Sequence, residues 1–366
     1  MKNLFQIVSF LFILYSGIVY SQESKIEAGI FLNNNKEEYV KIAFEIWNNP
    51  ELGYLEFESS KKLQDLLAKE GFTIEKGVAG LPTAFIASYG KGSPIIGIMG
   101  EFDALPGLSQ KAIPEKVPVV ENGPGHGCGH HVFGVASAAA AISVKHWLEE
   151  SGTPGTIKFF GTPAEEGGSG KVYMVRAGLF DELDIALHWH PADLNAANPW
   201  STNANISAKF RFSGIASHAA GAPEKGRSAL DGVEAMNYMV NMMREHLPQE
   251  TRIHYVITGG GGIAPNVVPP KAEVYYYVRY SDASELMNIF QRVVKAAEGA
   301  AMGTGTEMEY EIMGGVHSVL PNVALSKILD ANLREVGGVI YNEKENEYAE
   351  KIRASLLNPK TSMKAA

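Results

Sequence analysis

The stretch PGHGCGHH, residues 124–131, holds three of the chain's ten histidines and its single cysteine, Cys128. Gly129 separates Cys128 from His130, and residues 132–150, VFGVASAAAAISVKHWLEE, follow as an alanine-rich apolar run that predicts a helix. In a short glycine-flanked segment a thiolate and an imidazole can turn toward one point, and this donor pair suits a borderline-soft ion such as zinc. The segment therefore predicts a metal site at a helix start; a buried cysteine among loop histidines is the alternative.

Strands and helices alternate around this segment. Helical spacing of apolar residues extends over residues 37–71. The apolar runs that predict strands are residues 83–90, 94–100, 156–161 and 183–190, and residues 171–180 predict a further helix. The alternation predicts an α/β fold, in which sites gather where strands end and helices begin.

Two acidic residues, Glu165 and Glu166, follow the strand at residues 156–161. Adjacent side chains on extended backbone point in opposite directions, so the two carboxylates cannot approach one ion equally. One can bind metal while the other acts as general base toward a metal-activated water, which is the division of labour that hydrolysis needs. A solvated surface pair is the alternative.

The next apolar strand ends in LHWHP, which carries His188 and His190 on one face. A histidine that closes a core strand is often a hydrogen-bonded structural residue, but three such segments at successive ends of one sheet favour a metal centre. A nucleophilic Cys128 with a histidine base is a further alternative. It does not explain why Glu165, Glu166 and His190 should converge on the cysteine.

Residues 201–316 follow a different pattern. The segment NISAKFRFSG alternates, with Ile206, Ala208, Phe210 and Phe212 on one face. A helix, two strands, a second helix and a closing strand follow, and this βαββαβ order predicts a compact ferredoxin-like domain inserted into the first one.

The first 21 residues combine Lys2 with an uncharged apolar run and small residues spaced for cleavage after Ser21, which predicts a signal peptide and a secreted or periplasmic protein. A membrane anchor is the alternative, but the run barely reaches the roughly 20 residues that span a bilayer, so we expect no stable membrane insertion. An exported chain with one cysteine forms no internal disulfide, and Cys128 is therefore expected to have a function. The formal charge of -9 argues against nucleic-acid binding.

Six motifs occur together in one order: GEFDALPG, NGPGHGCGHH, GTPAEEGGSGK, ALHWHP, GIASHAA and APNVVP. From about residue 37 to residue 357 the chain resembles the amidohydrolase branch of the dinuclear-metal aminoacylase and carboxypeptidase superfamily. The resemblance implies a mixed-sheet, metallopeptidase-like catalytic domain at residues 22–200. It also implies that residues 201–316 form a dimerisation or lid domain and that residues 317–366 begin the return to the catalytic domain.

The resemblance also implies roles for particular residues. It makes Cys128, His130 and Glu166 metal ligands and Glu165 the general base. A histidine of ALHWHP is a further ligand, for which His190 is favoured and His188 is the reserve. The resemblance implies that Asp103 orients a ligand. It implies that His218 polarises the scissile carbonyl across a dimer interface. Asn266 and Arg279 would hold a substrate carboxylate. It is an equally good interpretation that Asn266 is an asparagine of a turn and Arg279 an arginine on the surface of a strand.

The implied reaction is hydrolysis of amide bonds in N-acyl or N-aroyl amino acids with a free carboxylate, such as aminobenzoyl-glutamate. Two divalent ions per subunit, zinc or manganese, and a homodimer are implied with it. The resemblance also calls for a late histidine ligand, but no histidine follows His317. We therefore expect the last strands and that ligand to be missing, which keeps a catalytically impaired binding or dimerisation protein as the alternative function.

Overall fold

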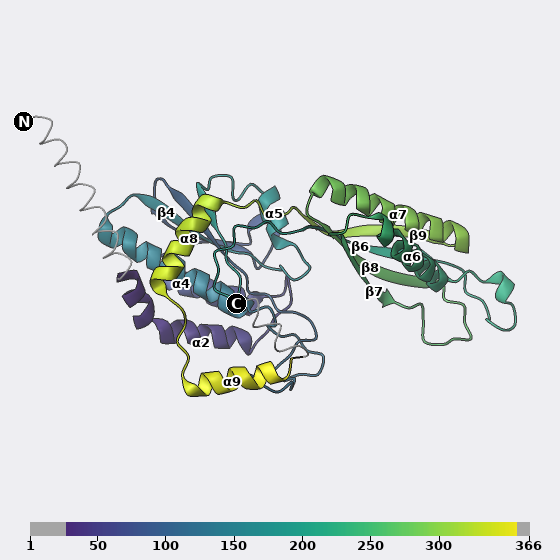
Figure 1. Cartoon of the computed structure of the whole chain (residues 1–366), viewed down its shortest axis with the longest axis horizontal. Helices are drawn as coiled ribbons and strands as arrows, with labels where there is room; N and C mark the ends of the chain where they lie inside the picture. Colours follow the sequence, from purple (N-terminus) through teal and green to yellow (C-terminus); the bar gives the residue numbers. More distant parts are fainter. Residues whose placement is uncertain (1–26, 357–366) are drawn as a thin grey trace, which may run out of the picture. The chain divides into compact units, whose positions relative to one another are not determined.

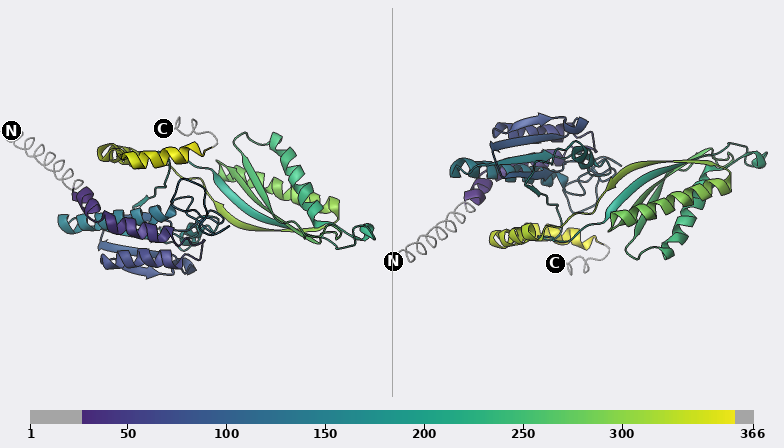
Figure 2. Two further views of the ribbon diagram at one scale, coloured as in Figure 1. Left: turned by 90° about the horizontal axis from the view of Figure 1, so that it is seen from below. Right: turned by 90° about the horizontal axis from the view of Figure 1, so that it is seen from above.

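The structure is a computed structural model that describes residues 27–356. The signal peptide predicted for residues 1–21 lies outside the described residues and stays a prediction. The chain divides into two compact units, of which the first comprises Met1–Leu194 and Ile340–Ala366 and the second Asn195–Val339. Figures 1 and 2 show the elements of each unit coloured along the sequence.

The first unit is built on a five-stranded sheet with the strand order β1-β2-β4-β3-β5. Its strands are β1 (Thr73–Lys76), β2 (Phe85–Lys91), β3 (Ile95–Gly100), β4 (Gly155–Gly161) and β5 (Ile185–Leu187). β2 pairs antiparallel with both β1 and β4, whereas β3 runs parallel to both β4 and β5. The predicted α/β class with a mixed sheet is therefore confirmed.

Helices cover both faces of this sheet. The helices of the unit are α2 (Lys36–Trp47), α3 (Phe57–Lys69), η1 (Val78–Gly80, a short 3-10 helix), α4 (His130–Ser151), α5 (Gly170–Arg176) and α9 (Glu343–Ala354). The larger core joins residues of α2, α3 and α4 to the sheet, and Leu63, Phe133 and Phe159 are fully buried. A smaller core on the other side includes Phe160 and Met174. Successive residues of β4 thus fill opposite cores, as the period of two in a strand requires.

The helical pattern predicted over residues 37–71 is interrupted. Two helices, α2 and α3, form there, and the chain between them contains Pro50 and Gly53. Proline cannot continue a helix interior, and glycine weakens one. None of the helices in the described part of the chain combines the length and apolar character that a membrane-spanning helix needs.

The second unit has a four-stranded sheet with the order β7-β8-β6-β9, in which every pair is antiparallel. Its elements are β6 (Ala204–Ser213), η2 (Pro223–Lys225), α6 (Ala229–Met243), η3 (Arg244–His246), β7 (Arg252–Gly259), β8 (Lys271–Tyr280), α7 (Ala283–Thr304), β9 (Glu307–Val316) and α8 (Val323–Val336). The predicted βαββαβ order is present, and the unit extends past the predicted boundary at residue 316 to include α8.

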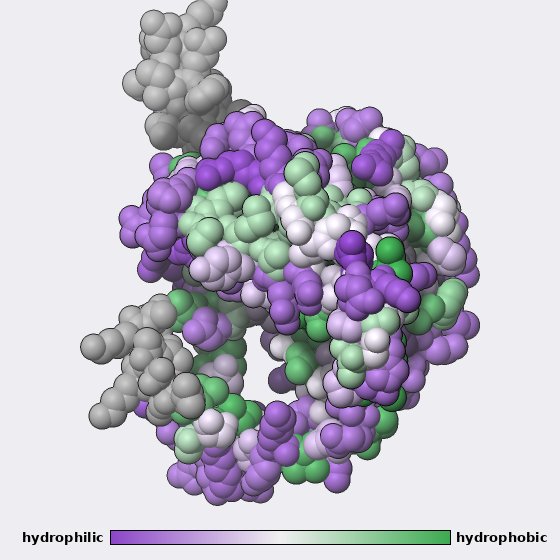
Figure 3. Space-filling model, turned by 90° about the vertical axis from the view of Figure 1, so that its right-hand side faces the viewer, coloured by the Kyte–Doolittle hydropathy of each residue, from purple (hydrophilic) through white to green (hydrophobic). Residues whose placement is uncertain are grey.

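Burial in the second unit follows the predicted alternation. Ile206, Ala208, Phe210 and Phe212 of β6 are buried and belong to a core shared with α6 and α7. Large apolar side chains also remain exposed in this unit, including Ile263, which is fully exposed. Figure 3 shows hydrophobic patches in green among purple hydrophilic residues on the face that it displays.

Candidate metal centre

The site lies where three neighbouring parallel strands of the first unit end. Gly100 of β3 pairs with Gly161 of β4, and Ile98 of β3 pairs with Leu187 of β5. The segments that follow these strands begin with Glu101, Thr162 and His188 and leave the sheet at one edge. Carboxyl ends of parallel strands are where α/β proteins place ligands, so the sheet itself brings distant motifs together.

The segment containing Cys128 is fitted against the segment containing His190. Gly129 has a φ of 79°, and a Cβ at this position would come within 3.0 Å of the Pro191 side chain. Only glycine accepts both the left-handed backbone and the close approach. On the other side, the Trp189 indole N–H donates to Ser137 Oγ of α4 at 3.0 Å. These contacts hold the LHWHP segment against the start of α4.

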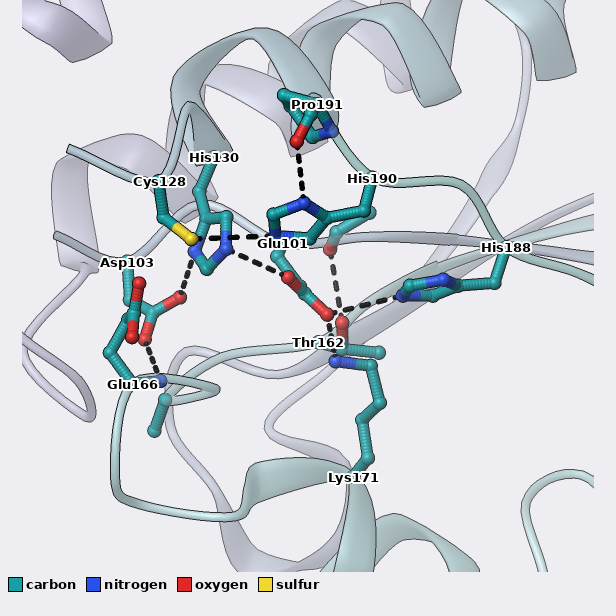
Figure 4. A network of polar contacts seen from close by, with 12 residues as sticks. Glu101, Asp103, Cys128, His130, Thr162, Glu166, Lys171, His188, His190 and Pro191 are labelled. Atoms are coloured by element: carbon teal, nitrogen blue, oxygen red, sulfur yellow. Dashed lines mark hydrogen bonds and ion pairs between the residues drawn. The ribbon is translucent and has the colours of Figure 1, made fainter. Parts of the chain in front are cut away.

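Three donor atoms converge as a result. Cys128 Sγ lies 3.5 Å from His190 Nε2, and one donor atom each from Cys128, His130 and His190 lie within 4.8 Å of one another. His190 Nδ1 donates to the carbonyl of Pro191 at 2.8 Å, which leaves Nε2 with its lone pair directed at the thiol (Figure 4). The structure thus brings together three of the predicted ligands, and it places His190 rather than His188 beside the cysteine.

Asp103 is buried and joins two of the motifs. Its Oδ1 lies 2.9 Å from His130 Nδ1, and its Oδ2 accepts the backbone N–H of Glu166 at 2.8 Å. An oriented imidazole with a carboxylate on one nitrogen is the usual arrangement at a metal-bound histidine. Asp103 therefore fixes the ring of His130, with Nε2 facing away from it and into the site.

Glu101 is a site residue that was not predicted from the sequence. Its side chain is 2% exposed; Oε2 lies 3.0 Å from His130 Nε2, and Oε1 contacts Lys171 and, at 3.3 Å, His188 Nε2. A signal for it existed, because Glu101 stands two residues before Asp103 directly after a strand, and this spacing places two side chains on one side of extended backbone. His188, the reserve ligand, contacts this carboxylate in the structure.

Glu165 and Glu166 do not lie on extended backbone, so the predicted reason for their divergence is wrong. They follow Ala164, whose φ is 55°, in a turn closed by a hydrogen bond from Gly168 N to Ala164 O at 3.1 Å. The turn still separates the carboxylates. Glu165 forms a donor group with Glu101 and His130 within 4.8 Å, whereas Glu166 interacts electrostatically with the Cys128 thiol.

Tyr54 and Glu56, which lie in the segment just before α3, hold the turn in place. Glu56, fully buried, accepts the backbone N–H of Ala164 at 2.7 Å and the hydroxyl of Thr83 at 2.9 Å. The Tyr54 hydroxyl donates to the carbonyl of Gly168. Neither residue was predicted from the sequence, since nothing in a helix-start segment identifies its partner 108 residues along the chain.

The electrostatics of the cluster favour a cation. Burial raises the pKa of the Cys128 thiol to about 12, and the carboxylates of Glu166 and Glu165 reinforce the effect. Burial lowers the pKa of His130, but contacts with Asp103 and Glu101 outweigh it and raise the pKa to about 10. A nucleophilic cysteine needs a lowered pKa, so these surroundings argue against a nucleophile. A thiolate here requires positive charge beside it, which a metal ion supplies.

His126 and His131 form a separate pair. Their rings lie 5.1 Å apart, and His131 also packs 4.9 Å from the ring of Trp47. Burial lowers the pKa of each to about 4. Both imidazoles are therefore neutral near pH 7, and His126, which is 4% exposed, is not a surface residue.

The remaining predicted residues belong to the second unit. His218 Nδ1 accepts the backbone N–H groups of Ala220 at 3.2 Å and Gly221 at 3.0 Å, which places the proton of a neutral ring on Nε2. Asn266 is close by, since its carbonyl accepts the N–H of Ala219 at 3.0 Å. Arg279 is not, because it pairs with Asn205 near the start of β6, whereas His218 follows the end of that strand.

A family profile, a curated relative and a solved structure are similar to this chain. The sequence profile of peptidase family M20/M25/M40 matches residues 97–357. The B component of p-aminobenzoyl-glutamate hydrolase from Escherichia coli (strain K12) is 46% identical over 325 residues, which are 88% of this chain and 67% of the relative. The "Aminobenzoyl-glutamate utilization protein" from Klebsiella pneumoniae superposes with a TM-score of 0.65 at 20% identity, covering 90% of this chain and 91% of that one.

A second solved structure shares the fold. A Bacillus subtilis protein described as a dinuclear metal binding peptidase from the M20 family superposes with a TM-score of 0.57 at 21% identity. The superposition covers 84% of this chain and 82% of that one. At this identity the likeness concerns the fold.

Proposed function

The chain belongs to peptidase family M20/M25/M40, and from this premise we propose that it is a metal-dependent amidohydrolase that cleaves N-acyl or N-aroyl amino acids with a free carboxylate. The observation that carries the proposal is that donor atoms of Cys128, His130 and His190 lie within 4.8 Å of one another. His130 also belongs to a second donor group, which contains Glu165. Thiolate, imidazole and carboxylate donors in one cluster are what a hydrolytic zinc or manganese centre needs.

The described residues fit a divalent ion. Glu101 Oε2, His130 Nε2 and Glu166 Oε1 are all buried; the first two lie 3.0 Å from each other, and none of the three meets a further hydrogen-bond partner within residues 27–356. Buried polar atoms normally have their full set of partners, so three under-satisfied atoms in one cluster suggest a ligand that joins them. Cys128, His130, His190 and Glu166 would hold the metal, with zinc or manganese and two ions per subunit proposed from the family. A bound divalent ion would polarise the scissile carbonyl and make water acidic enough to react near pH 7.

Glu165 is the proposed general base. Its side chain is in part exposed, and the partial burial of the carboxyl, followed by the charge of Glu101, raises its pKa. A raised pKa brings a carboxylate closer to the value that suits proton transfer near neutral pH. Glu165 would take the proton from the attacking water and pass it to the leaving amine. The contact of Asp103 with the backbone of Glu166 fixes the turn that carries both glutamates.

Recognition of the substrate is proposed for the second unit. His218 would donate from Nε2 to the carbonyl oxygen as the tetrahedral oxyanion forms, and Asn266, which lies next to it, would hold the carboxylate. Arg279 is a weaker candidate because the structure places it away from His218. We propose a homodimer in which His218 serves the site of the partner subunit. The name of the Escherichia coli relative makes p-aminobenzoyl-glutamate the first substrate to test.

The test measures glutamate release from p-aminobenzoyl-glutamate by the purified chain loaded with zinc or manganese. We expect release that stops when a chelator is added, returns with the metal, and is absent in Glu165→Gln. The α-amide of the same compound is a matched control that lacks the free carboxylate and should be a poor substrate. A folded, metal-loaded chain that binds the compound without cleaving it would instead support the binding-protein alternative.

A further inference from the structure

We propose that Glu101 is a metal ligand, whose Oε2 binds the same divalent ion as Nε2 of His130 while Lys171 and His188 hold its other oxygen. The inference rests on the proposed metal-dependent function. It adds to the site a carboxylate for which the motifs of the chain gave no role.

The contact between Glu101 and His130 has the form expected of two ligands. Oε2 and Nε2 lie 3.0 Å apart, which is the distance of an ion pair, and neither atom has another partner within residues 27–356. Two ligands about 2.1 Å from one ion are about 3.0 Å apart at the right angle of an octahedral site and about 3.4 Å apart at a tetrahedral angle. A thiolate and an imidazole at a tetrahedral angle are about 3.6 Å apart by the same geometry, and Cys128 Sγ and His190 Nε2 are separated by 3.5 Å. Both separations therefore lie in the range that two donors on one ion have.

His130 can serve only one ion. Its Nδ1 faces Asp103 at 2.9 Å, which leaves Nε2 as the single nitrogen for metal. That ring nevertheless belongs to two donor groups, one with Cys128 and His190 and one with Glu101 and Glu165. An ion on Nε2 thus has a carboxylate oxygen beside it on the Glu101 side, and that oxygen brings the negative charge that a divalent cation requires.

A purely structural role of Glu101 explains the contacts of only one of its two carboxylate oxygens, Oε1. Lys171 and His188 both contact Oε1, which would be sufficient to keep a buried ion pair neutral. Neither of them contacts Oε2, which is buried and, in the described part of the chain, pairs with Nε2 of His130 alone. When His130 is neutral, as a metal-binding histidine must be, its Nε2 gives Oε2 no proton, and a buried oxygen in that state is costly. A cation between Oε2 and His130 removes that cost, and Lys171 and His188 then act as positioning residues that aim Glu101 (Figure 4).

The test is a titration with Zn²⁺ alone against a competing chelator, on the full chain without substrate. Glu101→Gln should bind zinc at least about 10-fold more weakly, because even the loss of a residue that orients a ligand costs roughly that much. Glu182→Gln is the matched control, since Glu182 also pairs with a lysine, Lys158, but at the surface; its zinc affinity should equal that of the parent. Equal affinity of Glu101→Gln and the parent would overturn the proposal.

The variant Lys171→Gln distinguishes binding of metal by Glu101 from its ion pair with Lys171. It keeps the carboxylate but removes its lysine partner, so zinc affinity should fall much less than in Glu101→Gln. Equal losses in the two variants would mean that Glu101 acts through the ion pair, and the proposal would fail. If Glu101→Gln does not fold, Glu101→Asp replaces it, because Asp keeps its charge for Lys171 but withdraws its oxygens from His130. An unchanged zinc affinity of that variant would overturn the proposal equally.

Substitution with Co²⁺ gives a readout that is independent of hydrolysis. In Glu101→Gln the thiolate-to-cobalt absorption from Cys128 should persist while the ligand-field bands change, because one oxygen donor has been lost. Identical ligand-field spectra of Glu101→Gln and the parent would contradict the proposal. Since neither measurement uses a substrate, a chain that binds metal through Glu101 but hydrolyses nothing would refute the proposed reaction and leave this inference intact.

Discussion

Glu165 and Glu166 are neighbours in sequence but meet different groups in the structure. Glu165 shares a donor group with Glu101 and His130, whereas Glu166 is tied through its backbone N–H to Asp103 and faces the Cys128 thiol. The turn after Ala164 produces this separation. Two chemically identical side chains can therefore serve as base and ligand, because their surroundings differ.

The division of roles predicts the behaviour of Glu165→Gln. The substitution removes the proton acceptor but none of Cys128, His130, Glu166 and His190. The metal content should therefore equal that of the parent, while kcat should fall roughly 100-fold or more, as expected for the loss of a general base. Elemental analysis and steady-state kinetics on one preparation check both parts. Loss of metal from Glu165→Gln would mean that the roles of the two glutamates are exchanged.

Several single residues were identifiable from sequence because their motifs are local. Cys128, His130 and Asp103 lie in short glycine-containing segments next to predicted strands or helices, and the structure gathers all three. Glu101 was missed although it stands in the same motif as Asp103, because its partners Lys171 and His188 lie 70 and 87 residues away. A carboxylate in a sequence gives no sign of which distant side chain will pair with it.

At the scale of elements, the turn that carries the glutamates depends on the start of α3. Glu56 accepts the N–H of Ala164 and the hydroxyl of Thr83 from a fully buried position. Tyr54 holds the carbonyl of Gly168 at the other end of the turn. The turn that carries Glu165 and Glu166 is therefore supported by an element that contributes no donor to the two donor groups of the site.

Glu56→Ala should for this reason be costly. It leaves the buried N–H of Ala164 without its acceptor, so we expect the free energy of unfolding to fall by roughly 1–3 kcal/mol. The turn should also loosen and lower kcat even where the metal content is unchanged. Denaturant unfolding measures the first effect, with Glu75→Ala, an exposed strand residue, as the control. A Glu56→Ala chain as stable as Glu75→Ala would show that the turn does not need this support.

Periodicity predicted the elements well but not their ends or their turns. The apolar runs of β3 and β4 and the alternation of β6 follow directly from which faces are buried. The expected strand over residues 183–190 is reduced to Ile185–Leu187, and His188 and His190 lie beyond it. The left-handed backbone at Ala164 was not predictable, because alanine seldom adopts it and nothing local requires it. It follows from the contacts with Glu56 and Gly53 in the folded protein.

At the scale of the whole molecule, the proposed catalytic groups belong to different units. Glu165 lies in the first unit and His218 in the second. If His218 serves the partner's site, a mixed dimer of His218→Ala and Glu165→Gln chains contains one intact composite site. Equal mixing after subunit exchange should then restore about a quarter of the parental activity, since about half of the dimers are mixed and each has one working site.

Each variant alone is the control for this experiment, and both should be nearly inactive. Subunit exchange is verified separately with differently tagged chains. No recovery in a verified mixed dimer would mean that His218 acts within its own chain or has no catalytic role. The metal centre would be unaffected by that result, because all its described donors lie in the first unit.

X-ray absorption at the zinc edge of the zinc-loaded chain tests the central claim, that these motifs converge on a metal centre, most directly. We predict a sulfur neighbour at about 2.3 Å together with nitrogen or oxygen neighbours at about 2.0–2.2 Å. The sulfur signal should disappear in Cys128→Ser, because Cys128 is the chain's single cysteine. A zinc spectrum that shows only oxygen and nitrogen neighbours in the parent chain would contradict the account.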